Sequence, residues 1–540
     1  MATCGEVLVK LLEGYGVEHV FGIPGVHTVE LYRGLAGSSI RHITPRHEQG
    51  AGFMADGYSR TRGKPGVCFI ITGPGMTNIT TAMGQAYADS IPMLVISSVQ
   101  SRSQLGGGRG KLHELPNQAA LVAGVAAFSQ TLMSAADLPQ LLARAFAVFD
   151  GARPRPVHIE IPLDVLVEPA DHLLPARPVR TAPAGAAPHM VAQMAACLAA
   201  AQRPLILAGG GALNAGAEIA QLAEHLQAPV ALTINAKGLL PASHPLQIGS
   251  TQTLPATREL VAEADVVLAI GTELAETDYD VTFKGGFDIP GSLLRIDIDP
   301  DQTVRNYLPV LALVADAQQA AHALLMALHG HSQPVRQGAW GSQRAARLRE
   351  ANAATWDAAT LSQTALLNAV LHTLPEAILV GDSTQPVYTG NLTLDMPAPR
   401  RWFNASTGYG TLGYALPAAI GAWLGSAEAP VVCLIGDGGL QFTLPELASA
   451  VEAQVPLIVL LWNNQGYEEI KKYMLNRAIE PVGVDIHTPD FIGVARALGA
   501  VAEEVADVAQ LQAALQRAQG LRRPTLIQVD QHQWQAAVTS

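Results

Sequence analysis

Two apolar runs near the C-terminus constrain the fold more than any other feature of this chain. Residues 431–439 (VVCLIGDGG) end in Gly-Asp-Gly, and residues 456–464 (PLIVLLWNN) end in two asparagines. Asp437 and Asn464 lie 27 positions apart, from 437 to 464, and residues 443–453 (TLPELASAVEA) between them are predicted to form a helix. This order predicts a βαβ crossover, whose parallel strands present both side chains at the same edge of a sheet.

That edge is suited to a divalent cation carrying a diphosphate. Asp437 and Asn464 offer the carboxylate and amide oxygens that Mg²⁺ prefers. The backbone N–H groups of Gly438 and Gly439, in the turn that follows, are suited to phosphate oxygens. Gly-Asp-Gly alone is also ordinary turn chemistry. The asparagine pair at the end of the next strand favours the cofactor interpretation over the turn.

Composition excludes several other classes of protein. The chain has 540 residues, about three domains' length, and its 49% hydrophobic and 15% charged residues suit a large α/β enzyme. The net charge of −12, without a basic block, argues against nucleic acid as a partner. No stretch approaches about 18 uninterrupted apolar residues, so no membrane span is expected.

The N-terminus and the cysteines add a cellular expectation. The first residues lack a cleavable signal pattern, and the four cysteines, Cys4, Cys68, Cys197 and Cys433, form neither a metal-binding spacing nor a disulfide framework. A cytoplasmic protein is therefore expected.

Three blocks alternate short apolar runs with amphipathic stretches, at residues 1–167, 190–328 and 360–535. A Pro-rich passage at 168–190 and a polar stretch at 329–338 separate them. The predicted strands are residues 19–23, 66–72, 93–97, 156–162, 204–211, 229–234, 264–271, 292–299, 377–382, 431–439, 456–464 and 524–530. Short strands alternating with helices predict an α/β fold of three doubly wound parallel-sheet domains.

With Gly-Asp-Gly and Asn-Asn at this spacing, the chain resembles the thiamine diphosphate (ThDP) enzymes of the acetolactate synthase and benzoylformate decarboxylase superfamily. The resemblance implies that Asp437, Asn464 and the main-chain carbonyl of Gly466 bind Mg²⁺, which bridges to the cofactor's diphosphate. It also implies an N-terminal pyrimidine-binding domain, a central domain and a C-terminal diphosphate-binding domain over the three blocks.

Residues 45–60 (PRHEQGAGFMADGYSR) resemble the family segment that holds an essential glutamate, here Glu48. In the family this carboxyl hydrogen-bonds the aminopyrimidine ring and favours its imino tautomer, which removes a proton from the thiazolium carbon. Such a carboxyl must be shielded from bulk water. The alternative is an exposed glutamate at a helix start, where a negative charge is favourable in any protein.

Two glycine-rich loops resemble further parts of the family's site. In residues 406–422 (STGYGTLGYALPAAIGA), Leu412 matches the residue that wedges the cofactor into its bent shape, and the carbonyl of Gly410 matches the acceptor for the aminopyrimidine amine. The glycines at 408, 410 and 413 would permit close backbone approach. Gly73-Pro74-Gly75 with Asn78 matches a second loop that lines the site. Each loop also has a plainer interpretation, as a turn before a packed helix.

The family shares the release of CO₂ from a 2-oxo acid, and its members differ in whether a proton or a second carbonyl compound completes the reaction. His27 follows FGIPG, and His113 stands where acetolactate synthases carry Gln. Either histidine could be the proton donor, and each is equally credible as a structural residue. The adjacent histidines of pyruvate decarboxylase are absent, and Ile71 replaces the histidine of benzoylformate decarboxylase.

Substrate choice is predicted in the segment after the metal loop (GYEEIKKYM). Glu469 and Tyr473 are four residues apart and share one helix face, and a carboxylate there would pair with a cationic substrate. Alternatively, Glu468, Lys471 and Lys472 belong to an ordinary solvated helix with charge pairs. Segments 22–36, 46–60 and 73–78 are most similar to decarboxylases of 5-guanidino-2-oxopentanoate (2-ketoarginine), which implies Glu469 as the guanidinium partner.

The family resemblance leads to three further expectations, which concern FAD, alternative functions and the oligomeric state. Flavin adenine dinucleotide (FAD) is not expected, because residues 207–216 (LAGGGALNAG) do not make GxGxxG and residues 271–280 (GTELAETDYD) lack the relatives' Arg-, Phe- and Asp-rich motif. Two alternative functions remain, an acetolactate synthase-type carboligase and a catalytically silent paralogue that binds ThDP. Because the family's cofactor lies between subunits, a homodimer or a homotetramer is expected.

Overall fold

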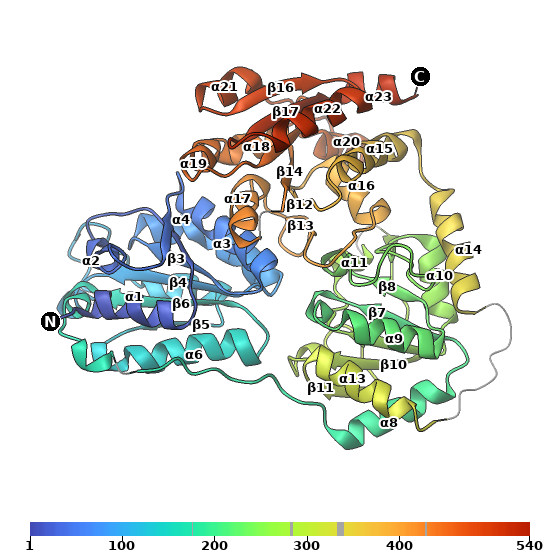
Figure 1. The fold of residues 1–540 in the computed structure, drawn as a ribbon, viewed down its shortest axis with the longest axis horizontal. Helices are drawn as coiled ribbons and strands as arrows, with labels where there is room; N and C mark the ends of the chain where they lie inside the picture. The colour runs from blue at the N-terminus through green and yellow to red at the C-terminus, as the bar shows by residue number, and fades with distance from the viewer. Residues whose placement is uncertain (175, 281–283, 332–339, 427–428, 540) are drawn as a thin grey trace. The chain divides into compact units, whose positions relative to one another are not determined.

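The computed structural model describes residues 1–540 except 175, 281–283, 332–339, 427–428 and 540, and contains three sheets (Figure 1). Their strand orders are β2-β1-β3-β4-β6-β5, β11-β10-β9-β7-β8 and β13-β12-β14-β15-β17-β16. The strands pair in parallel, as in β1 with β3 and β14 with β15. In each sheet the chain starts at an inner strand and winds out to both edges. The predicted doubly wound α/β fold is confirmed.

The first sheet contains β1 (His19–Gly22), β2 (Arg41–Ile43), β3 (Gly66–Ile70), β4 (Met93–Val99), β5 (Phe128–Thr131) and β6 (Pro156–Pro162). Its helices are α1 (Cys4–Gly14), α2 (Val29–Arg33), α3 (Glu48–Arg62), α4 (Pro74–Ala88), α5 (Gln118–Val122), α6 (Leu138–Gly151) and α7 (Leu163–Leu166). Alternate strand residues such as Phe69 and Ile96 pack in one core with α1 and α6. Cys68, the neighbour of Phe69 on β3, points the other way, toward Ala51 of α3.

The central sheet contains β7 (Pro204–Ala208), β8 (Val230–Leu232), β9 (Val266–Ile270), β10 (Ser292–Asp297) and β11 (Leu311–Val314). Its helices are α8 (Pro188–Ala200), α9 (Gly216–Leu226), α10 (Pro255–Glu263), α11 (Glu276–Tyr279), α13 (Ala317–Leu328) and α14 (Ser342–Ala353). Leu268 packs with α8, α9 and α13, whereas its neighbour Val267 packs with α10 and α14. The period of two therefore covers both faces of the sheet.

The C-terminal sheet contains β12 (Ile378–Gly381), β13 (Trp402–Asn404), β14 (Val431–Gly436), β15 (Ile458–Asn463), β16 (Val501–Val505) and β17 (Thr525–Asp530). Its part of the chain forms α15 (Ala358–Thr373), α16 (Gln385–Thr393), α17 (Ala415–Gly425), α18 (Asp437–Thr443), α19 (Glu446–Glu452), α20 (Glu468–Asn476), α21 (Phe491–Ala497), α22 (Val508–Gln519) and α23 (Gln531–Thr539). The single helix predicted over 443–453 is wrong in detail. Two helices, α18 and α19, flank Pro445, because proline cannot donate the hydrogen bond that would continue a helix through it.

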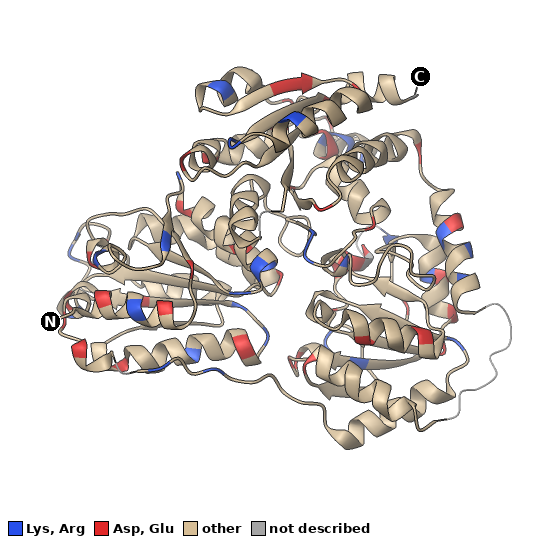
Figure 2. Cartoon of the chain, viewed as in Figure 1, with Lys and Arg blue, Asp and Glu red and all other residues tan. Residues whose placement is uncertain are grey.

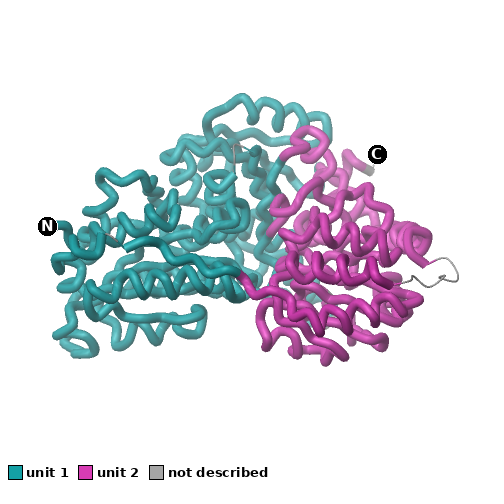
Figure 3. The backbone as a smooth tube through the Cα atoms, turned by 60° about the horizontal axis from the view of Figure 1, so that its bottom comes forward, with its two compact units in different colours: residues 1–182, 377–384, 404–533 teal, residues 183–376, 385–403, 534–540 magenta. Residues whose placement is uncertain are grey.

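The chain forms two compact units (Figure 3). Unit 1 comprises residues 1–182, 377–384 and 404–533, and unit 2 comprises residues 183–376, 385–403 and 534–540. The domain ranges 1–167, 190–328 and 360–535 stay predictions. Of the Pro-rich passage 168–190, residues 176–187 contain no helix or strand, as predicted, whereas Asp171–Leu173 form a 3₁₀ helix and α8 begins at Pro188. Of the predicted polar stretch 329–338, positions 332–338 lie outside the described residues.

Helices α3 and α17 pack tightly together inside unit 1. A Cβ atom added at Gly57 would overlap the backbone of Ala418, and one added at Gly421 would overlap the backbone of Met54. Only glycine allows this approach from both sides. The contact fixes α3, which begins at Glu48, against the helix that follows the 406–413 loop.

Charged residues of both signs are interspersed along the ribbon rather than gathered in blocks (Figure 2). In the part of the chain that the structure describes, no helix is both long enough and apolar enough to span a membrane.

Candidate functional site

Asp437 lies where β14 gives way to α18, and its side chain is almost fully buried at 1% exposure. Burial raises the pKa of its carboxyl, and backbone N–H groups of Asn464, Gly438 and Gly466 lower it in part. The structure therefore brings Asp437 and Asn464 together, as the strand-end spacing predicted, and places Gly466 beside them.

Two glycines make this turn possible. A Cβ at Gly466 would lie 2.5 Å from the carbonyl oxygen of Val484, and a Cβ at Gly438 would lie 2.6 Å from the ring of Tyr467. The resulting loop offers a carboxylate, an amide oxygen and a backbone carbonyl, a hard oxygen donor set that fits Mg²⁺. Among the described residues no three His, Cys, Asp or Glu side chains are grouped to hold a metal, so this mixed set is the candidate.

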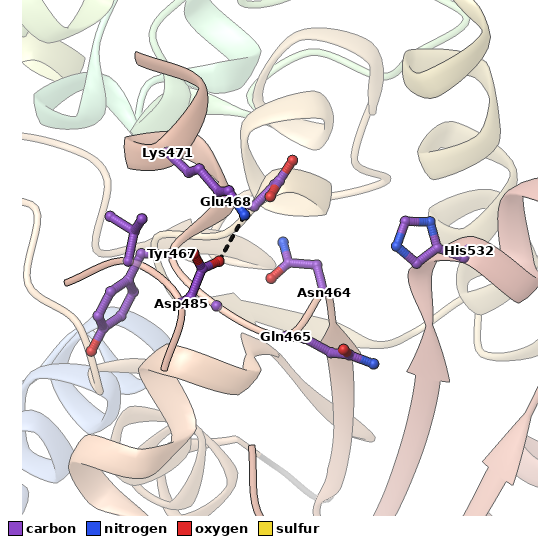
Figure 4. Close-up of a pocket in the computed structure, with 9 residues that line it drawn as sticks. Asn464, Gln465, Tyr467, Glu468, Lys471, Asp485 and His532 are labelled. Atoms are coloured by element: carbon purple, nitrogen blue, oxygen red, sulfur yellow. Dashed lines mark hydrogen bonds and ion pairs between the residues drawn. The ribbon is translucent and has the colours of Figure 1, made fainter. Parts of the chain in front are cut away.

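A pocket of about 200 Å³ opens beside the same loop (Figure 4). Its lining residues are Asn464, Gln465, Gly466, Tyr467, Glu468, Lys471, Val484, Asp485 and His532. The Lys471 ammonium pairs with the Asp485 carboxylate at 2.7 Å. His532 was not predicted. It follows Asp530, which pairs with Asn463 in the β15–β17 register, so the end of a third strand was the available signal.

Asp382 is a second buried carboxyl that the sequence interpretation missed. It follows β12 and accepts hydrogen bonds from the N–H of Ser383 at 2.9 Å and the N–H of Ala415, the first residue of α17, at 3.1 Å. A Cβ at Gly439 would lie 2.8 Å from its Oδ1 atom. Burial raises its pKa to about 6. Asp382 thus joins the start of α17 to α18, and its position after an apolar strand, like that of Asp437, could have identified it.

The 406–413 loop has the backbone that its glycines predicted. Gly408, Gly410 and Gly413 have φ of +73°, +75° and +80°, in the left-handed region that favours glycine. The Thr443 hydroxyl at the end of α18 donates to the carbonyl of Gly413 at 2.8 Å. Leu412, half-buried, precedes that contact. The loop and the helix that begins at Asp437 are therefore neighbours.

A buried charge network holds this loop to the N-terminal part of unit 1. The Arg60 guanidinium pairs with Asp56 and Asp89, each at 2.6 Å. The Thr407 hydroxyl donates to Asp89 at 3.0 Å, and the Tyr414 hydroxyl donates to Asp56. Burial opposes the charge on Arg60, but the two carboxylates raise its pKa well above the usual range. Tyr414 and Asp56 are 358 positions apart, so the local sequence reveals only the Asp56–Arg60 pair, whose members are four residues apart on α3.

Glu48 is the first residue of α3 and is half-buried, so it is not the exposed helix-start glutamate of the alternative interpretation. Its Oε2 atom accepts a hydrogen bond from Nδ2 of Asn78 at 2.9 Å. A Cβ at Gly75 would lie 3.4 Å from its Oε1 atom. Asn78 and Gly75 of the predicted Gly73-Pro74-Gly75 loop therefore lie against the two oxygens of the Glu48 carboxyl.

His27 and His113, which are 86 positions apart, form a pair with ring centroids 5.1 Å apart. Both Nδ1 atoms are buried and have no hydrogen-bond partner among the described residues. The backbone of His113 packs on Gly73, where a Cβ would lie 2.7 Å from the His113 carbonyl oxygen. Burial lowers the pKa of His27, and a positive charge on His113 would lower it further. The pair thus borders the loop that contacts Glu48.

Glu469 and Tyr473 lie on α20, a helix without a buried residue. The Glu469 carboxylate is 48% exposed and lies 3.6 Å from the Lys472 ammonium. The Arg477 guanidinium lies 4.9 Å from the centroid of the Tyr473 ring. Charge pairs of the kind that the alternative interpretation expects are therefore present. The role of Glu469 and Tyr473 in substrate choice stays a prediction.

Comparison with known proteins identifies related sequences over the whole chain. Residues 2–121 match the N-terminal TPP binding domain of thiamine pyrophosphate enzymes, residues 191–324 match their central domain, and residues 382–529 match their C-terminal TPP binding domain. A probable 2-ketoarginine decarboxylase from Pseudomonas aeruginosa is 49% identical over 534 residues, which cover 98% of this chain and 94% of that protein.

Acetolactate synthases are more distant relatives. The isozyme 1 large subunit of Escherichia coli is 33% identical over 469 residues, covering 86% of this chain and 82% of its own length. The acetolactate synthase of Arthrospira platensis is 30% identical over 564 residues, covering 98% and 94%.

Proposed function

The chain belongs to the thiamine pyrophosphate enzymes, and on that premise we propose that it is a ThDP- and Mg²⁺-dependent 2-oxo acid decarboxylase. The proposed substrate is 5-guanidino-2-oxopentanoate, with 4-guanidinobutanal and CO₂ as products, in arginine catabolism. The observation that carries the proposal is 49% identity over 98% of the chain to a protein named as a probable 2-ketoarginine decarboxylase. A cytoplasmic location and a homodimer or homotetramer belong to the same proposal, which needs no FAD.

The residues of the Asp437 loop would hold the metal. Asp437, the side-chain oxygen of Asn464 and the carbonyl of Gly466 are the proposed Mg²⁺ ligands, and the amides of Gly438 and Gly439 would face the diphosphate. In support, backbone N–H groups of Asn464 and Gly466 already hydrogen-bond to the Asp437 carboxyl and lower its pKa. When bound, ThDP would supply a carbon nucleophile for the 2-oxo group and hold the electron pair released with CO₂.

The N-terminal part of unit 1 would handle protons. Glu48, oriented by Asn78, would hydrogen-bond the aminopyrimidine ring, as the family resemblance implies. His27 and His113 are the proposed source of the proton that takes the place of the departing carboxylate on the substrate carbon. In support, the two rings are in contact at a tilt of 49°, and His113 packs on Gly73, on the loop that also contacts Glu48. A positioned acid of this kind contributes roughly 10²- to 10⁴-fold to a rate.

A decarboxylation screen tests the proposal. Protein reconstituted with Mg²⁺ and ThDP is expected to release CO₂ from 2-ketoarginine with a higher kcat/KM than from pyruvate, branched-chain or aromatic 2-oxo acids. The second candidate function is an acetolactate synthase-type carboligase, favoured by relatives at 33% and 30% identity. Acetolactate rather than acetaldehyde as the main product from pyruvate would establish that function instead. Release of no CO₂ from any 2-oxo acid would indicate a silent ThDP-binding paralogue. The presence of Glu48, Asp437 and Asn464, the residues that the family resemblance assigns to the chemistry, argues against such a paralogue.

Replacing Glu469 with Gln tests the proposed guanidinium partner. The variant is expected to raise KM for 2-ketoarginine about 10- to 100-fold, because a hydrogen bond to a charged group is worth about 1.5–3 kcal/mol. KM for an unbranched 2-oxo acid with an uncharged side chain should change less than about twofold. Steady-state CO₂ release measures both values.

The matched control is Glu504→Gln, which removes an exposed carboxylate from β16. It is expected to leave both KM values unchanged. An equal rise in KM for the charged and the uncharged substrate in Glu469→Gln would count against a guanidinium contact at that position.

A further inference from the structure

Glu446, the first residue of α19, is a buried carboxyl that has no part in the proposed chemistry. It is 1% exposed and lies against the turn that precedes α3. Its Oε1 atom accepts the backbone N–H of Arg46 at 3.0 Å and that of His47 at 3.1 Å. Its Oε2 atom accepts the Ser449 hydroxyl at 2.7 Å. A Cβ atom added at Gly50 of α3 would overlap the Glu446 carboxyl, so the carboxyl fits only because this position has no side chain.

A buried carboxyl at this position is costly to the fold. Burial raises the pKa of Glu446 to about 7, and the hydrogen bonds from Ser449, Arg46 and His47 only partly offset that rise. An apolar side chain of similar volume would avoid the desolvation cost. The carboxyl does, however, accept hydrogen bonds from the backbone N–H groups of Arg46 and His47. Both residues precede the first residue of α3, so neither N–H group has a partner within that helix.

The rest of α19 is fastened to the same segment of the N-terminal part. The Arg46 guanidinium pairs with Glu452 in the last turn of the helix. Arg41, the first residue of β2, donates from Nη2 to the carbonyl of Ala453 at 2.6 Å. Contacts at both ends of α19 therefore fix residues 41–47 as a unit, with Glu446 at the end nearest to α3.

The turn that Glu446 holds leads directly to Glu48. His47 is the N-cap of α3, and its Nδ1 atom accepts the N–H of Gln49 at 3.1 Å. Glu48 follows as the first helical residue and is held on its other side by Asn78. The position of the Glu48 backbone thus depends on an acceptor from α19, which lies one turn beyond the helix that begins at Asp437.

We propose that Glu446 is a positioning residue that fixes the start of α3 and thereby the Glu48 carboxyl. This inference rests on the proposed role of Glu48 in activating the cofactor. Two consecutive helices then serve the proposed chemistry in different ways. Asp437, the proposed metal ligand, begins α18, and Glu446, which begins α19, holds the turn that leads to Glu48 of the same chain.

Glu446→Ala tests the inference with two independent measurements on the full-length protein. In the protein without cofactor, amide hydrogen exchange over residues 45–53 is expected to become about tenfold faster or more, because the N–H groups of Arg46 and His47 lose their acceptor. In protein loaded with Mg²⁺ and ThDP, kcat/KM should fall about 10- to 100-fold, the loss expected when a catalytic group is displaced by up to about 1 Å. ThDP affinity should change less than about threefold, since Asp437 is untouched.

Two further variants make the result specific. Glu446→Gln keeps an Oε1 acceptor for both backbone N–H groups and is expected to restore exchange protection and most of kcat/KM. Glu452→Gln, which alters the half-exposed carboxylate at the other end of α19, should leave both near wild type, because an exposed ion pair contributes little and the Arg41 hydrogen bond to Ala453 remains. If Glu446→Ala does not fold, Glu446→Leu, which fills the space without an acceptor, has the same expected results.

Unchanged exchange over residues 45–53 in Glu446→Ala would overturn the inference, as would equal loss of protection in Glu452→Gln. The exchange measurement needs no turnover, so it distinguishes failure of this inference from failure of the proposed function. In the latter case the wild-type protein would release no CO₂, while the exchange difference at the start of α3 would still be present.

Discussion

Replacing Asp437 with Ala is expected to abolish Mg²⁺-dependent binding of ThDP at any cofactor concentration that saturates the wild-type protein. Mutation of a residue that only hydrogen-bonds to a metal ligand already costs about 10- to 100-fold in metal affinity, so loss of a direct ligand should cost more. Asp437 is the only carboxylate of the proposed ligand set, so no other negative charge in the set compensates for its loss. Quenching of tryptophan fluorescence on titration with ThDP, with and without Mg²⁺, measures the effect.

The control for this variant lies in the pocket beside the Asp437 loop. Asp485 has a carboxylate that is 69% exposed and is paired with Lys471. Asp485→Asn removes one negative charge from the pocket and is expected to change ThDP affinity by less than about threefold, as for an exposed ion pair. If the two variants weaken ThDP binding equally, general pocket charge rather than coordination by Asp437 holds the cofactor, and the proposed metal site is wrong.

Sequence patterning found the interior strands because parallel sheets bury them on both faces. The strands that it missed are β2, β5, β11, β13 and β16, and each lies at an edge of its sheet. Edge strands are covered less completely, and β5 has no fully buried residue among Phe128–Thr131. β13 is buried but only three residues long. A continuous apolar run is therefore a signal for the middle of such sheets and a poor one for their edges.

The same reasoning separates the site residues that could be predicted from those that could not. Asp437 and Asn464 follow buried strands, so topology alone brings them to one edge. Glu446 and Arg60 are not at strand ends. The Arg46 N–H that Glu446 accepts is 400 positions away, and of the two carboxylates that pair with Arg60 only Asp56, four residues away, is near in sequence. Charges of this kind look like solvated helix residues until the packing of α3 against the C-terminal part of unit 1 is known.

The two halves of the site also differ in how their side chains are stabilised. The Asp437 carboxyl is buried among backbone N–H groups, an arrangement that a bound cation would complete. Glu48 is instead half-buried and held by a single side-chain amide. The proposed sharing of a proton with the ring requires that no other donor competes for the remaining oxygen, Oε1. That atom would lie 3.4 Å from a Cβ at Gly75, where the other nearest atoms belong to the apolar side chains of Ile70 and Ile71.

Glu48→Gln is expected to lower kcat for CO₂ release by about 10²- to 10⁴-fold, the range for loss of a positioned acid or base. An amide cannot share a proton with the aminopyrimidine ring, although the variant keeps an oxygen for the Asn78 hydrogen bond. ThDP affinity should stay within about threefold of wild type, because the metal ligands are unchanged. Rapid-quench measurement of CO₂ from 2-ketoarginine, together with ThDP titration, gives both quantities.

A second measurement separates loss of proton sharing from misplacement. In wild-type protein, exchange of the thiazolium C2 proton of bound ThDP with deuterated solvent, followed by acid quench and NMR, is expected to be faster than turnover. In Glu48→Gln the exchange should slow by at least the factor by which kcat falls, since exchange limits turnover only once it has become the slower step. Glu30→Gln, which removes the carboxylate paired with the exposed Arg33, should leave the exchange unchanged. Fast C2 exchange in Glu48→Gln would mean that another group activates the cofactor, and the assignment of Glu48 would then be wrong.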